Sequence, residues 1–163
     1  MGLMGHFIGD GAQPLHTTIH HNGWTGDNPE RYTRWPGIHS WIDGGFIAKA
    51  EITIEKLLPQ INTVRAIELK KQLDGRDPIF VATMEYLTAQ NAQVVPFYEM
   101  EKEDRFKSAQ ATKDSIGREF IEKQLIRGGE MLGAIWLTAW ANASDDSYLT
   151  RELAKRAAAN TTP

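Results

Sequence analysis

The histidines of this chain are confined to its N-terminal part, and their spacing restricts how that part can fold. All five lie within the first 39 of 163 residues, at His6, His16, His20, His21 and His39. His6 and Asp10 stand four residues apart, and so do His39 and Asp43. On a helix this spacing puts both side chains of a pair on one face. The sequence therefore predicts two helical segments that each present a His and an Asp.

A further histidine follows a turn. His16 comes directly after Gln13-Pro14-Leu15, and the proline interrupts regular helix there. The chain contains no Cys, so all candidate metal donors are nitrogen and oxygen atoms. Such a donor set suits zinc in a hydrolytic rather than a structural site. A single His/Asp pair at this spacing is most often a surface or core pair, but two pairs together with His16 predict a metal site.

The motif H-x3-D-x2-Q-P-L-H that begins at His6 is followed by a Gly/Asn-rich loop and by H-x3-D at His39. This ordered combination resembles the S1/P1 nuclease and zinc-dependent phospholipase C superfamily. Members of that superfamily are helical enzymes that hydrolyse phosphodiesters with a trinuclear zinc cluster. The motifs span residues 6–43, and the rest of the chain resembles the family more loosely, through a helical C-terminal half.

The resemblance implies a role for each motif residue. His6 would bind one zinc, and Asp10 would be the carboxylate that bridges this zinc to a neighbour and takes part in catalysis. His16, His39 and Asp43 would hold a further zinc. The family's other ligands come from a segment that precedes the first motif, whereas here the chain opens five residues before His6. We therefore expect one to two Zn²⁺ ions in place of three, and an N-terminally truncated family domain.

The activity implied by the resemblance is zinc-dependent hydrolysis of phosphodiesters by a metal-activated water. Asp43, where a phospholipase more often carries Glu, favours cleavage of single-stranded nucleic acid. Two alternatives stay open: a zinc-dependent phospholipase C, and a zinc-binding remnant without catalysis. The sequence leaves the role of His20 and His21 open: they support the metal ligands, contact the substrate, serve as metal ligands themselves, or are loop residues without a role in the site. Family members are generally secreted or periplasmic, and residues 1–6 do not form a signal peptide.

Composition adds bounds on these functions. A length of 163 residues fits one domain, and a hydrophobic content of 41% with 24% charged residues is typical of a globular fold. The net charge of −3 argues against nonspecific attraction to nucleic acid. It does not exclude an enzyme whose metals meet a phosphodiester substrate. No stretch has the roughly 20 apolar residues of a membrane span, so stable membrane insertion is not expected. Protein partners are left undetermined.

The remaining pattern is helical throughout. No strand alternation is present, nor are the Glu-x-x-His and His-Glu-x-x-His motifs of other metal enzymes. We expect an all-α helical bundle of the phospholipase C/P1 nuclease type, formed by residues 1–163 as one domain. The predicted helices cover residues 2–10, 39–61 with a bend at Gly44-Gly45, 64–73, 80–98 with a kink at Pro96, a long helix from Asp114 or Ser115, and a short final helix capped within 144–147.

Several regions carry expectations about burial. Leu3, Met4, Phe7 and Ile8 are available to the core, and Trp136 and Trp140 are read as core residues of the long helix. Residues 99–114 are read as a solvated, charge-rich connection. Residues 13–37 form a loop, and its three rings at Trp24, Tyr32 and Trp35 either line a substrate pocket or anchor the loop.

Overall fold

The computed structural model describes residues 2–70, 72–106 and 115–160, and all regular structure within these residues is helical. This confirms the all-α prediction. The elements are α1 (Gly2–Gly11), the 3₁₀ helix η1 (Pro14–Thr17), α2 (Ile38–Ser40), the π-helix η2 (Trp41–Phe46), α3 (Ile47–Lys49), α4 (Ile54–Leu57), the 3₁₀ helix η3 (Leu58–Gln60), α5 (Pro78–Asn91), α6 (Val94–Lys102), α8 (Ser115–Ala141) and α9 (Ser147–Asn160). Among these helices, none has the length and apolar character needed to cross a membrane.

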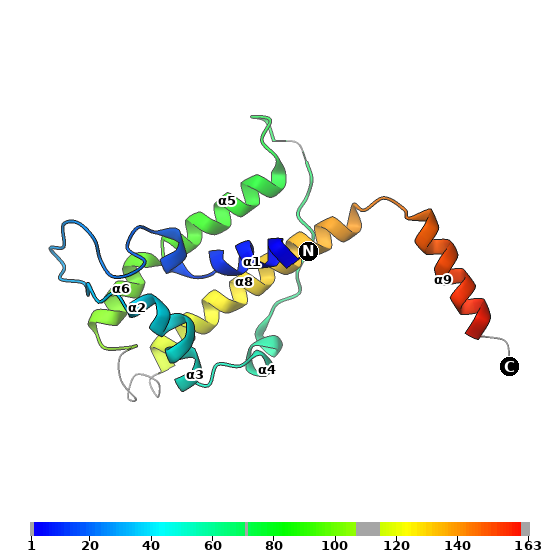
Figure 1. Cartoon of the computed structure of the whole chain (residues 1–163). Coiled ribbons are helices and arrows are strands. Elements are labelled where there is room, and N and C mark those ends of the chain that lie inside the picture. Colours follow the sequence, from blue (N-terminus) through cyan, green and yellow to red (C-terminus); the bar gives the residue numbers. More distant parts are fainter. Residues whose placement is uncertain (1, 71, 107–114, 161–163) are drawn as a thin grey trace.

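Helices α1, α5 and α8 lie against one another and form the body of the bundle (Figure 1). Glycine sets how closely they approach. A Cβ atom at Gly11 would lie 2.8 Å from Leu87 Cδ2, and one at Gly128 would lie 2.8 Å from Ala12 Cβ. Both distances are shorter than van der Waals contact between carbons. The C-terminal end of α1, which carries Asp10, is therefore held tightly between α5 and α8.

A second packing centre lies behind α2 and η2. Ile38, Ile42 and Phe46 recur every four residues and are all fully buried or nearly so. They meet an aromatic group in which Phe97 of α6 stacks on Phe106 with 5.0 Å between ring centroids. Burial of such large apolar side chains stabilises each by about 1.5–3 kcal/mol. This cluster fixes one side of α2 and η2 and leaves the other side to present His39 and Asp43.

The expected burial of several apolar residues is wrong. Ile8 is buried as predicted, but Leu3 is 80% and Phe7 68% exposed. On α8, Trp136 is 40% and Trp140 79% exposed, so neither is a core residue. Trp140 stands at the C-terminal end of α8, and α9 extends away from the bundle beyond that end (Figure 1). Periodicity identified an apolar face in each case, but the neighbouring elements of the described chain cover that face only in part.

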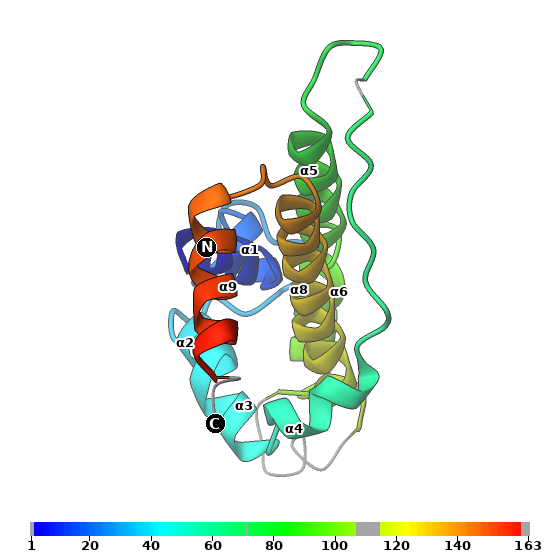
Figure 2. The ribbon, with the colours of Figure 1, turned by 90° about the vertical axis from the view of Figure 1, so that its right-hand side faces the viewer.

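The helix predicted for residues 39–61 is interrupted. Glu51 has a left-handed backbone with φ of 53°, and it ends α3 before α4 begins at Ile54. The helix predicted for residues 64–73 is also wrong, because the described residues of this segment form no helix; the chain passes beside α8 before it turns at Leu73 (Figure 2). The amide of Ile67 donates to Thr138 Oγ1 over 2.7 Å. Contacts with α8 therefore replace the internal hydrogen bonds that a helix would make.

Two further boundaries differ from expectation. The helix predicted for residues 80–98 is divided into α5 and α6. Pro96 lies in the first turn of α6, where backbone N–H groups have no intrahelical partner, so the proline costs no hydrogen bond. Residues 99–106 are not simply solvated, because Glu101 is 1% exposed and Phe106 fully buried. Residues 107–114, with the predicted cap at Asp114, lie outside the described residues. The final helix is capped as predicted, by Asp146 accepting from the amides of the first turn of α9.

Candidate metal centre

The turn that presents His16 is held by its own residues. Gln13 Oε1 accepts from the amide of Leu15 over 3.3 Å at the start of η1, and Pro14 takes the first helical position. Pro14 and Leu15 are both buried. Because its two neighbours are anchored in the protein, His16 projects from a fixed backbone.

The other two members of the cluster come from α2 and from the π-helical turn that follows it. His39 lies in α2, and Asp43 lies in η2, which replaces the simple bend expected at Gly44-Gly45. A π-helical turn of this kind is rare and is often found at functional sites. Gly45 makes it possible, because a Cβ there would lie 2.3 Å from the Trp41 ring. The Trp41 indole N–H in turn donates to the carbonyl of Phe106 over 2.6 Å, so the ring cannot easily move aside.

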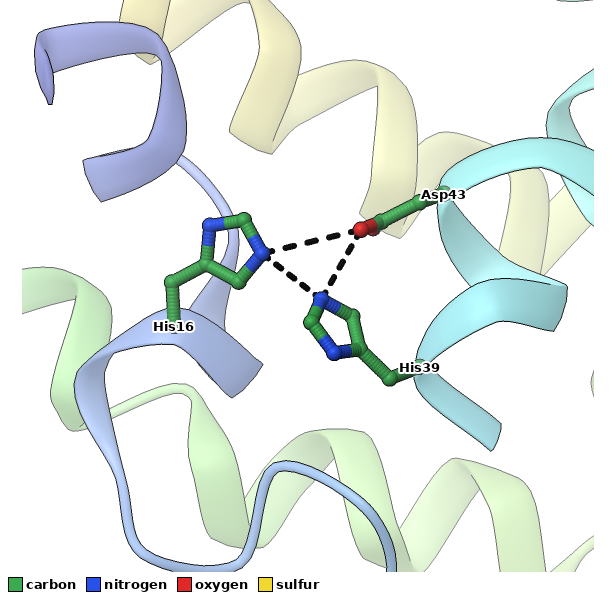
Figure 3. A group of neighbouring side chains, drawn as sticks. All are labelled: His16, His39 and Asp43. Carbon is green, nitrogen blue, oxygen red and sulfur yellow. Dashed lines mark hydrogen bonds and ion pairs between the residues drawn. The ribbon is translucent and has the colours of Figure 1, made fainter. Parts of the chain in front are cut away.

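His16, His39 and Asp43 converge on one point (Figure 3). His16 Nε2 lies 2.6 Å from His39 Nε2, and His39 Nε2 lies 2.9 Å from Asp43 Oδ2. The third side of the triangle, from His16 Nε2 to Asp43 Oδ2, is 3.6 Å. This set, called the His-His-Asp triad below, brings together the three residues that the family resemblance implies for one zinc.

Neighbouring groups orient two of the three donors. His16 Nδ1 lies 3.0 Å from the carbonyl oxygen of Asp10. Since a carbonyl oxygen can only accept, Nδ1 carries the proton and Nε2 presents its lone pair to the triad. Gln13 Nε2 donates to Asp43 Oδ1 over 2.6 Å, which directs Oδ2 toward the two histidines. Such outer hydrogen bonds are typical of protein metal sites.

The triad fits a zinc ion. With zinc–ligand bonds of about 2.0–2.2 Å, two ligands of a tetrahedral ion lie about 3.3 Å apart. The three observed separations are 2.6, 2.9 and 3.6 Å, so small side-chain adjustments would admit the ion. Two histidines and one carboxylate would leave the fourth position open, as in catalytic zinc sites.

His6 and Asp10 lie beside the triad but do not complete a second one. His6 Nε2 is 3.4 Å from Asp10 Oδ2, and Asp10 Oδ1 is 3.9 Å from His16 Nδ1. Their side chains are 67% and 46% exposed. In the part of the chain that the structure describes, the only group of three or more potential metal donors is the triad.

The two spare histidines have different surroundings. His20 stacks on Trp24 with 3.9 Å between ring centroids, and its Nδ1 accepts from the amide of Thr25. Tyr98 donates to the carbonyl of His20, and burial raises the pKa of Tyr98 to about 12. His20 and Trp24 therefore anchor the loop. His21 instead lines a cavity together with His16 and His39.

The triad stands between two cavities. One, of about 210 Å³, has a largely apolar wall that includes Ile42, Ile47, Ile121 and Leu125. The other, of about 390 Å³, is bordered by His21, Phe7 and Leu87 among others. Asp10 and His16 line both cavities. No lysine or arginine is among the described residues that line either one.

One residue of the site, Gln13, was not predicted from the sequence. Gln13 was read only as part of the turn before His16, whereas the structure uses its amide to hold Asp43. Its place between Asp10 and His16 was the only available signal, because hydrogen bonding across thirty residues cannot be read from local spacing.

Similarity to known proteins does not identify the function of this chain. Comparison of the chain with models of protein families, with curated proteins and with solved structures found no match. The function is therefore argued from the site itself.

Proposed function

We propose that this protein is a zinc-dependent phosphodiester hydrolase of the S1/P1 nuclease type that acts on single-stranded nucleic acid. The observation that supports the proposal most strongly is the convergence of His16, His39 and Asp43, with 2.6 to 3.6 Å between their donor atoms. These residues belong to the motifs that resemble the family, and they would hold the metal. The donor atoms are nitrogen and oxygen, which suits a hydrolytic zinc site.

The chain's own groups would prepare the site for catalysis. The Asp10 carbonyl fixes the tautomer of His16, and Gln13 fixes the orientation of Asp43. Zinc, when bound, supplies Lewis-acid activation of water and offsets charge at the phosphoryl group. Asp10 is the proposed catalytic carboxylate, because it borders both cavities and lies beside His16. With His6 it offers two donors for a second, weaker zinc position.

The lining of the cavities bears on the substrate. Since no described lining residue is lysine or arginine, a bound phosphodiester would rely on metal for the neutralisation of its charge. The apolar wall of the smaller cavity offers a surface for a base or for another apolar substituent. A phospholipid could use the same wall, so zinc-dependent phospholipase C activity is the alternative hydrolytic reaction.

A non-catalytic zinc-binding role is the second candidate, and one observation favours it. His6 and Asp10 form an exposed pair with no third donor among the described residues. A zinc ion with two protein ligands is held weakly compared with one in a three-ligand site. Under this alternative the triad binds zinc but the position that Asp10 would bridge stays empty.

Two measurements separate these functions. Zinc per chain is determined for the parent, for His39→Ala and for Asp10→Asn. Hydrolysis of single-stranded DNA, single-stranded RNA and a phosphatidylcholine analogue is measured with zinc present. Asp145→Asn serves as the control, because it changes an exposed carboxylate in the linker before α9.

We expect His39→Ala to release the triad zinc. Asp10→Asn should keep that zinc but lose at least about a hundredfold in hydrolysis, as removal of a catalytic acid or base group does. Full zinc stoichiometry in His39→Ala would contradict the metal assignment. Bound zinc without cleavage of any substrate, or equal activity in Asp10→Asn and the parent, would leave the zinc-binding role as the function.

A further inference from the structure

A further hollow lies on a different side of the helical segment that carries His39 and Asp43. It has a volume of about 530 Å³ and is lined by Thr33, Trp35, Trp41 and Lys49. We call it the tryptophan pocket. It shares no lining residue with the two cavities at the triad. Trp41 is two residues from both His39 and Asp43, and two residues on a helix correspond to about half a turn.

Glycines hold both indole rings close to the backbone. A Cβ at Gly37 would lie 2.7 Å from the Trp35 ring, and one at Gly45 would lie 2.3 Å from the Trp41 ring. Neither ring could take its place if the glycine beside it carried a side chain. The Trp41 ring is also tied to the Phe106 carbonyl through its N–H. The Trp41 ring is thus held in a fixed position, which lowers the entropic cost of binding a ligand against it.

A positive charge stands over one ring. Lys49 Nζ lies 5.1 Å from the centroid of Trp41. Within residues 2–70, 72–106 and 115–160, no carboxylate lies within ion-pair distance of this ammonium group. Thr33 Oγ1 accepts from the amide of Trp35 over 3.2 Å, which leaves the hydroxyl proton of Thr33 available to a ligand.

We propose that the tryptophan pocket binds a planar aromatic molecule that carries a negatively charged group. Indole faces stack on any planar ring, and an ammonium group attracts an anion. A neutral sugar would need several directional polar contacts, whereas the pocket offers one hydroxyl and one ammonium group. Its volume is within the range of small-molecule sites, which is about 300–1,000 Å³. A nucleotide and an aromatic carboxylate share this chemistry.

The test uses the full chain and calorimetric titration with four probes. Adenosine 5′-monophosphate and 2-naphthoate represent the two sources of an aromatic anion. Adenosine lacks the charge, and inorganic phosphate lacks the ring. The variants are Trp35→Leu and Lys49→Gln, and each has a matched control on exposed surface elsewhere, Trp140→Leu and Lys123→Gln. His39→Ala is included because it disrupts the triad and leaves the tryptophan pocket intact.

We expect at least one aromatic anion to bind with a Kd below about 1 mM and at least tenfold tighter than adenosine or phosphate. Trp35→Leu and Lys49→Gln should each weaken binding about tenfold. Trp140→Leu, Lys123→Gln and His39→Ala should leave it unchanged. The probe that binds tells whether nucleotides, carboxylates or both are accepted.

Three results would overturn the proposal. The first is that neither aromatic anion binds below about 1 mM. The second is binding that is as strong in Trp35→Leu and Lys49→Gln as in the two surface controls. The third is binding lost in His39→Ala, which would place the ligand at the triad. None of these results depends on whether the protein is a hydrolase, so the two proposals fail independently.

Discussion

The two adjacent glycines of the π-helical turn provide a sensitive test of how Asp43 is positioned. A Cβ at Gly45 would lie 2.3 Å from the Trp41 ring, whereas a Cβ at Gly44 would meet no atom within 4 Å. Gly44→Ala should therefore be neutral or stabilise the protein by about 0.5–1 kcal/mol, the usual gain from replacing glycine in a helix. Gly45→Ala brings the same gain together with a steric cost.

The size of that cost follows from what holds the ring. Overpacking by one methyl group costs about 1–3 kcal/mol. If Trp41 moves to relieve the contact, its 2.6 Å hydrogen bond to the Phe106 carbonyl is lost, at a further cost of about 1 kcal/mol. We expect Gly45→Ala to be about 2–4 kcal/mol less stable than Gly44→Ala. For a chain of 163 residues, this difference lowers Tm by roughly 5–15 °C.

The assay is thermal unfolding of both variants and of the parent, followed by zinc titration of each. Because the same turn carries Asp43, Gly45→Ala should also bind zinc more weakly than Gly44→Ala. Melting temperatures of the two variants within about 1 °C of each other would refute the proposed packing of Trp41 on Gly45. Equal zinc affinity despite a large difference in stability would show that the turn does not position Asp43.

Three further predictions concern the same half of the molecule. Removal of metal with a chelator should lower Tm by several degrees, and added zinc should restore it, because a ligand present at about 100 times its Kd stabilises the folded protein by about 2.7 kcal/mol. An unchanged melting curve would exclude a metal-organised site. Gln13→Leu should weaken zinc binding about tenfold, because it removes the hydrogen bond that holds Asp43. The control Gln60→Leu removes an exposed amide that bonds only to a backbone carbonyl, and it should leave zinc affinity unchanged in a competitive chelator titration. Burial raises the pKa of Tyr98 from 10.0 to about 12, so its contribution to stability is complete below pH 10 and is lost as the pH rises through 12. Urea unfolding at pH 8 and pH 11 should show a loss larger by about 1 kcal/mol in the parent than in Tyr98→Phe, and equal losses would contradict the direction of the shift.

The sequence was informative where the structure depends on neighbours along the chain. His39 and Asp43 are one helical turn apart, and the turn at Pro14 presents His16, so candidate metal donors at these positions could be predicted before any fold was known. The cap at Asp146 follows from equally local chemistry. His39 with Asp43, and Asp146 with the first turn of α9, are separated by a few residues, so backbone geometry alone brings them together. His16 and His39 are 23 residues apart, and their pairing was implied only by the family resemblance.

Prediction failed where the outcome depends on distant partners. The segment around Ile67 has a helical pattern, but its amide bonds to Thr138, which lies 71 residues away. Trp140 is apolar and on a helix, yet its exposure depends on where α9 lies. Gln13 was missed for the same reason, because its partner Asp43 is on another element. Hydrophobic periodicity tells which face of a helix is apolar but not what covers that face.

The absence of lysine and arginine from the described walls of the two triad cavities has a consequence for how a charged polymer would be handled. A protein that holds nucleic acid through many side-chain cations releases counterions on binding, and its affinity falls steeply with ionic strength. Within the two triad cavities the proposed metal would be the cation that meets the phosphate, so the Michaelis constant of the proposed hydrolase should change little between low and physiological salt. Without side-chain cations in the described walls of these cavities to retain a cleaved strand, each encounter should end after one cleavage. Digestion would then be distributive, and intermediate lengths would accumulate before short products appear.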